Sequence, residues 1–166
     1  MVKRFCWTFH LTVSAGTVED LHSSLLTKEL GESAALMPGA MKTLEWIREG
    51  GHPTALVTSS SRQYAEFYLD RLEVRSFFLE IVTAEDVQNG KPDPQPYEIG
   101  ARRIQRDSAD CIVLEDSVNG VLSGKASGAT VIAVPAKDEA RVHFSSADYI
   151  IDSLAEAVRI FEDMGL

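Results

Sequence analysis

Short apolar runs alternate with helix-like stretches through most of the chain, and this alternation limits the fold more than any other feature. The runs lie at residues 54–58, 79–83, 111–114, 130–134 and 149–151. Short, nearly continuous apolar runs are typical of strands that are buried on both faces of a sheet. Because helical stretches separate them, we predict a three-layer α/β domain with a mainly parallel sheet and right-handed crossovers.

The helical stretches have recognisable ends. Leu44 and Ile47 lie on a stretch that stops at Gly50-Gly51, where glycine can adopt the left-handed conformation that ends many helices. Further helices are predicted around residues 64–72, 96–104, 118–127 and 154–164.

Polar residues follow three of the predicted strands, at the edge where parallel sheets bind their ligands. In chain order they are Thr58, Ser59 and Ser60, then Lys91, and then Glu115 and Asp116. Hydroxyl and backbone N–H groups at a helix start can hold phosphate oxygens, a lysine supplies a compact positive charge, and adjacent carboxylates suit Mg²⁺. Together these groups predict a pocket for phosphate and magnesium.

Each of these groups also has a purely structural interpretation. Serines and threonines after a strand often cap the next helix, a lysine before proline is usually solvated, and an acidic pair can belong to an ordinary loop. The binding interpretation is favoured because all three groups converge on one edge of the predicted sheet.

Composition limits the partners that the chain can have. Its 16 basic and 25 acidic residues give a net charge of −9, which argues against nucleic acids and anionic membranes. A length of 166 residues suits one domain. Cys6 and Cys111 form neither a disulfide framework nor a metal motif, so we expect a reducing compartment such as the cytoplasm. Residues 1–15 only faintly imitate a signal peptide, because His10 and hydroxyl side chains interrupt their apolar stretch.

Three segments resemble successive motifs of the haloacid dehalogenase (HAD) superfamily, in its branch of β-phosphoglucomutase and sugar-phosphate phosphatases. They are ALVTSSS at 55–61, GKPDPQPYE at 90–98 and VLEDSVNGVLSGKASGATVIAVP at 113–135, within a resemblance over roughly residues 36–160. The resemblance implies a HAD-like, Rossmann-like three-layer sandwich. It also implies a Mg²⁺-dependent phosphatase or phosphomutase that acts on a small phosphorylated metabolite, in particular a sugar phosphate.

The resemblance, together with the residues themselves, suggests a role for each polar position. Thr58 and Lys91 are the predicted catalytic residues, and Thr58, Ser59, Ser60 and Lys91 are predicted to bind phosphate. Glu115 and Asp116 are predicted to bind Mg²⁺, and Asn119 is predicted to lie just beyond the metal.

The chain departs from the family pattern at its start. Members open with an Asp-x-Asp-Gly-Thr motif whose first aspartate attacks phosphorus, and the sequence contains no such motif. Its nearest match is VSAGT at 13–17, and only residues 21–30 resemble part of the family's cap domain. We therefore predict an N-terminally truncated member with its cap mostly absent: a leader at 1–20, a cap remnant at 21–36 and a HAD-like core at 37–166. Such a chain is expected to be inactive and to bind Mg²⁺ weakly.

Two classes of function stay open at this point. The chain either derives from an active phosphatase or phosphomutase, or is a noncatalytic module that binds a phosphate ligand or a partner protein. A receiver domain fits less well, because it needs a phospho-accepting aspartate after another strand. Residues 5–13 alternate like a half-buried strand, and whether they fill the position of the family's central strand is also open.

Overall fold

The computed structural model describes residues 35–137 and 139–166. The predictions for the leader, for nearly all of the cap remnant and for a strand at residues 5–13 therefore lie outside the described residues. None of the described helices is long and apolar enough to cross a membrane.

Helices and strands alternate along the described chain, which confirms the predicted α/β class. The strands are β1 (Ala55–Val57), β2 (Glu80–Val82), β3 (Ile112–Glu115), β4 (Thr130–Ala133) and β5 (Tyr149–Ile150). The helices are α2 (Ala40–Glu49), α3 (Arg62–Arg71), α4 (Gln95–Arg103), α5 (Val118–Ala126) and α6 (Ala157–Asp163). The strands are shorter than predicted at most ends, because flanking residues such as Thr54 and Thr58 still pair with β2 but no longer belong to the regular ladder.

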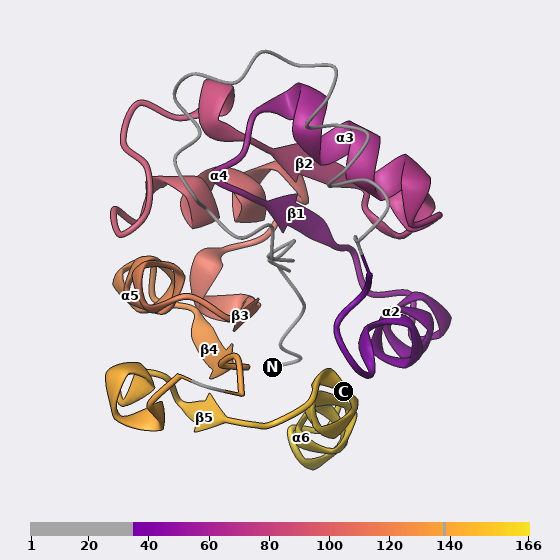
Figure 1. Cartoon of the computed structure of the whole chain (residues 1–166), viewed down its shortest axis with the longest axis vertical. Helices are drawn as coiled ribbons and strands as arrows, with labels where there is room; N and C mark the ends of the chain where they lie inside the picture. Colours follow the sequence, from indigo (N-terminus) through magenta and orange to yellow (C-terminus); the bar gives the residue numbers. More distant parts are fainter. Residues whose placement is uncertain (1–34, 138) are drawn as a thin grey trace.

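All strand pairs are parallel, as predicted, but the described strands form two sheets instead of one. One sheet pairs β1 with β2, and the other has the order β3-β4-β5. Figure 1 shows β1 and β3 on the inner sides of the two sheets, with β2 and β5 toward the outside. Among the described residues no strand pairing joins β1 to β3, and this break separates the two sheets.

Two hydrophobic cores lie on opposite faces of the strands and extend across the break. On one face, Leu56 of β1 and Ile112 of β3 pack in a common cluster with Leu44 of α2, Leu69 of α3 and Phe161 of α6. Because side chains alternate across a strand, the neighbours of Leu56 belong to the other core. Packing on this first face therefore joins the two sheets.

The second core is covered by α4 and α5. It contains Val57 and Val113 from the two sheets, together with Tyr97 and Ala101 of α4 and Val121 of α5. Helices thus cover both faces of the strands, which gives the three layers predicted from the sequence (Figure 1). The carboxyl ends of β1 and β3 remain at one edge, where the polar residues of the candidate site follow.

The first core provides a direct test of this packing. Phe161 is 0% exposed and its ring centroid lies 5.3 Å from that of Trp46, whereas Phe67 on α3 is 36% exposed. We expect Phe161→Ala to lower the free energy of unfolding by about 3–5 kcal/mol through lost burial and a residual cavity. Urea denaturation should show a loss below about 1 kcal/mol for the matched Phe67→Ala. Equal losses in both variants would contradict the placement of α6.

Candidate active site

Lys91 joins the two sheets at their carboxyl edge. It lies between β2 and α4, and its Nζ donates to Oε1 of Glu115 at 2.6 Å and to the carbonyl oxygen of Val57 at 3.1 Å. Val57 ends β1 and Glu115 ends β3. The side chains of Lys91 and Glu115 are only 5% and 0% exposed, so this ion pair is shielded from water.

The carboxylate of Glu115 is held by further hydrogen bonds. The hydroxyl of Tyr97 donates to Oε1 at 2.5 Å, and the backbone N–H and hydroxyl of Ser117 donate to Oε2 at 3.1 and 2.9 Å. Burial raises the pKa of Glu115, but the charge of Lys91 and these hydrogen bonds outweigh it and hold the pKa below its ordinary value of 4.5. Glu115 is therefore an ionised, fully enclosed carboxylate.

The start of α5 fits closely over this carboxylate. Ser117 caps the helix, since its hydroxyl also accepts from the N–H of Gly120 at 3.0 Å. A Cβ at Gly120 would overlap the carboxyl group of Glu115. Glycine is needed at this position because the helix backbone approaches the buried ion pair directly.

A pocket of about 490 Å³ opens beside this ion pair. Ser59, Lys91, Asp116 and Asn119, four of the residues predicted from the sequence, line it. The other described lining residues are Met37, Ser117, Val118, Ala136 and Glu139. The structure thus brings groups from three separate strand ends to one cavity, which only the fold can unite.

The remaining predicted residues are placed around this pocket in different ways. Thr58 follows β1, where its N–H donates to the carbonyl of Val82 at 2.9 Å and its Oγ1 accepts from the N–H of Ser60 at 3.1 Å. Thr58 is half-buried, and Ser60 is exposed. Glu115 faces Lys91, Tyr97 and Ser117, whereas the next residue, Asp116, lines the pocket. The metal-binding role of Glu115 therefore stays a prediction.

The donor chemistry of the pocket suits part of a magnesium site. Mg²⁺ prefers hard oxygen ligands, and Asp116 offers a carboxylate in a cavity that Asn119 also lines. Over residues 35–137 and 139–166, no group of three or more His, Cys, Asp or Glu side chains is arranged to hold a metal. Asp116 thus fits as one ligand of a set that the described residues do not complete.

Sequence reasoning did not single out Tyr97 and Ser117 as partners of Glu115. An aromatic residue in the first turn of a helix usually indicates core packing, and Tyr97 does pack in the second core. Its ring also lies 4.9 Å below Nζ of Lys91. The signal that was available is the serine directly after Glu115-Asp116, since a serine there predicts a helix N-cap.

Comparison with known proteins places this site in a family. The model of the haloacid dehalogenase-like hydrolase family matches residues 11–134, about three quarters of the chain. The chain belongs to this family. The matched range begins earlier than the roughly 36–160 over which the motifs suggested the resemblance, and it ends at the last residue before Pro135.

Relatives in the family are phosphatases. The chain is 40% identical over 121 residues to the bifunctional riboflavin kinase/FMN phosphatase of Arabidopsis thaliana. The aligned region covers 72% of this chain and 32% of that protein. It is 36% identical over 127 residues to hexitol phosphatase A of Escherichia coli. Here the aligned region covers 75% of this chain and 57% of that protein. The chain thus spans less than two thirds of the length of these relatives.

A solved structure of a HAD family hydrolase from Deinococcus radiodurans, which contains bound phosphate and sodium, has a similar fold. Its TM-score is 0.76 at 27% identity, and the match covers 83% of this chain and 64% of that one. These similarities confirm the family and the branch of sugar-phosphate phosphatases that the motifs indicated.

Removal of Lys91 tests the buried ion pair. Because Lys91→Ala leaves the enclosed carboxylate of Glu115 without its counter-charge, we expect the free energy of unfolding to fall by about 3–5 kcal/mol in the absence of metal. The matched control is Lys125→Ala, which removes a 2.7 Å pair with Asp148 whose side chains are 35% and 36% exposed. Thermal and urea denaturation should show a loss below about 1 kcal/mol for that control. Equal stability of Lys91→Ala and the parent would mean that Lys91 is solvated.

Proposed function

We propose that the pocket beside Lys91 binds the phosphate group of a small phosphorylated metabolite, as in a HAD phosphatase or phosphomutase. We further propose that these 166 residues do not by themselves transfer that group. The observation that carries the first part is the buried Lys91, whose ammonium group is fixed by Glu115 at the wall of a pocket that Asp116 and Ser59 also line.

The positive charge of Lys91 supports a phosphate monoester as ligand, in a pocket whose lining also contains the acidic residues Asp116 and Glu139. A phosphate dianion needs positive charge and hydrogen-bond donors, and Lys91 supplies the charge while Thr58, Ser59 and Ser60 supply hydroxyl groups. Because Glu115 and Val57 hold the ammonium group of Lys91, its position is fixed before a ligand arrives. A fixed charge loses little conformational entropy on binding.

Five polar residues in or next to the pocket have a role in this proposal. Lys91 neutralises charge on the phosphate, Thr58, Ser59 and Ser60 orient its oxygens, and Asp116 contributes a ligand to Mg²⁺. Phosphatases of this family generally depend on Mg²⁺, which would polarise the phosphate oxygens when it is bound. We further propose that this metal binds weakly, because the sequence contains no Asp-x-Asp-Gly-Thr motif.

The class of substrate follows from the relatives. Hexitol phosphatase A is among them, and its name indicates a sugar alcohol phosphate as substrate. A pocket of about 490 Å³ is large enough for a small phosphorylated metabolite. We therefore propose a sugar phosphate or a related small monoester as the ligand of this chain.

Covalent transfer requires an attacking group that the motifs of this chain do not provide. No Asp-x-Asp-Gly-Thr motif occurs in the sequence. In a well-studied hydrolase, loss of the nucleophile lowers turnover by about a millionfold. Electrostatic stabilisation by Lys91 cannot restore that loss, so phosphate binding without turnover is the function that we propose for these residues alone.

A paired assay of turnover and binding tests the proposal. We expect the chain to release no detectable phosphate from glucose 6-phosphate in the presence of Mg²⁺, and to bind inorganic phosphate in a ³¹P NMR titration. Ser59→Ala should weaken that binding, whereas Lys125→Ala on the distant surface should not. Turnover that disappears in Asp116→Ala would contradict the proposal, because another carboxylate would then attack. The absence of phosphate binding would favour a protein-binding module.

A further inference from the structure

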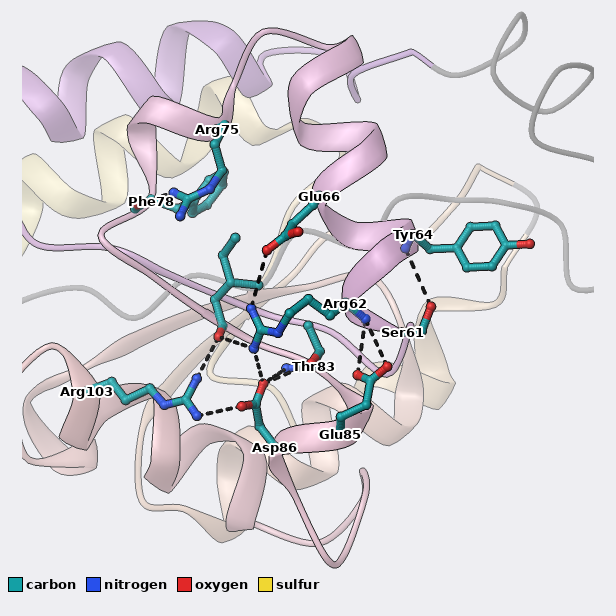
Figure 2. A network of polar contacts seen from close by, with 11 residues as sticks. Ser61, Arg62, Tyr64, Glu66, Arg75, Phe78, Thr83, Glu85, Asp86 and Arg103 are labelled. Atoms are coloured by element: carbon teal, nitrogen blue, oxygen red, sulfur yellow. Dashed lines mark hydrogen bonds and ion pairs between the residues drawn. The ribbon is translucent and has the colours of Figure 1, made fainter. Parts of the chain in front are cut away.

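A second network of charges lies beside the candidate site and is not explained by it. Figure 2 shows the carboxylate of Asp86 between the guanidinium groups of Arg62 and Arg103. Its Oδ2 accepts from Nη2 of Arg62 at 2.6 Å, and its Oδ1 accepts from Nη2 of Arg103 at 2.6 Å. The N–H and hydroxyl of Thr83 donate to Oδ2 at 2.8 and 2.9 Å. This carboxylate therefore connects the start of α3, the end of β2 and the end of α4.

The hydrogen bonds from Thr83 fix a tight turn at Ala84–Asp86, directly after β2. This turn also contacts the segment that follows β1. The N–H of Ala84 donates to the carbonyl of Ser60 at 3.1 Å, and both carboxylate oxygens of Glu85 accept from the backbone N–H of Arg62 at 3.1 Å. With the bond from Arg62 to Asp86, the turn holds the segment at three points.

One part of this network has a simpler explanation. β2 is at the edge of its sheet among the described strands, and the carbonyl of Ile81 accepts from Arg103 at 2.7 Å and from Arg62 at 3.4 Å. Such contacts satisfy the open edge of a strand. They do not explain why Ala84 and Glu85 contact the backbone of Ser60 and Arg62, because neither contact involves that edge.

Asp86 stays ionised, as lasting ion pairs with Arg62 and Arg103 require. Burial raises the pKa of Asp86, but hydrogen bonds from Arg103 and Thr83 and the charge of Arg103 hold it well below its usual value of 3.8. The carboxylate is thus ionised throughout the neutral and mildly acidic range. Its side chain is only 15% exposed, so salt screens these contacts less than it screens surface pairs.

We propose that Asp86 and Glu85 are positioning residues that hold Thr58–Ser60 in the conformation that receives phosphate, an inference that rests on the function proposed above. Neither residue touches the phosphate. They act through the turn at Ala84–Asp86, which fixes the carbonyl of Ser60 and the N–H of Arg62 and thereby the end of the Thr58–Ser60 segment that leads into α3. If this turn is loosened, the segment must lose conformational entropy when phosphate binds, and the affinity falls.

Two acidic residues that contact the same arginine give a matched test. Glu85→Ala and Glu66→Ala each remove one exposed carboxylate near Arg62, but Glu66 contacts only its side chain, at 3.7 Å. Removing a negative charge should by itself favour an anion. We nevertheless expect Glu85→Ala to weaken binding of inorganic phosphate severalfold in the ³¹P NMR titration, and Glu66→Ala to leave it equal or tighter.

The stronger variant is Asp86→Asn, which keeps the shape of the side chain and removes its charge. We expect about tenfold weaker phosphate binding, by analogy with the loss of metal affinity when a partner that orients a metal-binding residue is removed. Amide hydrogen exchange of Ala84 and Thr58 should rise in this variant, because their bonds to Ser60 and Val82 open more often. Phe161→Leu serves as a control that lowers stability without contacting the loop.

The outcomes separate this inference from the proposed function. Phosphate binding that is lost in Ser59→Ala but unchanged in Asp86→Asn and Glu85→Ala would overturn the positioning role alone. Equal weakening in Asp86→Asn and Phe161→Leu would also overturn it, because general destabilisation would then be the cause. If the parent binds no phosphate, both proposals fail. Weakening in both acidic variants, with faster exchange at Ala84 and no weakening in Glu66→Ala, supports the inference.

Discussion

The ion pair between Lys91 and Glu115 is the interaction on which the rest of the site depends. It is buried, and it connects the last residue of β1 to the last residue of β3 across the break between the sheets. A buried charge without its partner is costly, so both residues are needed once either is present. This pair leaves space only for glycine at position 120. Its carboxylate also requires the hydrogen bonds that the hydroxyls of Tyr97 and Ser117 donate.

The acidic residues Glu115 and Asp116 are adjacent but face different surroundings. Successive side chains of a strand point to opposite sides, so the end of β3 directs Glu115 toward Lys91 while Asp116 lines the pocket. One carboxylate thus fixes the lysine, and the other lines the pocket.

The sequence predicted the class of fold and the edge of the site because both depend on local patterns. Apolar runs located β3 and β4 to within a residue or two, and the polar residues after the predicted strands at 79–83 and 111–114 indicated Lys91 and Asp116 as neighbours. The bond from Tyr97 to Glu115 could not be predicted, since an aromatic residue in a helix gives the same pattern whether or not its hydroxyl has a partner. Asp86 contacts Arg62 and Arg103, which lie on other elements of the fold. Such contacts between elements leave no pattern in the hydrophobic periodicity of the sequence, so they could not be predicted from it.

A crystal structure of the chain soaked with Mn²⁺ and inorganic phosphate would test the central claim most directly. Mn²⁺ replaces Mg²⁺ at oxygen sites and is located by its anomalous scattering. The account predicts phosphate within hydrogen-bond distance of Lys91 and of the Thr58–Ser60 segment, and Mn²⁺ on the carboxylate of Asp116, with Glu115 still bonded to Lys91. Phosphate bound elsewhere, with the pocket beside Lys91 empty at saturating concentration, would contradict it.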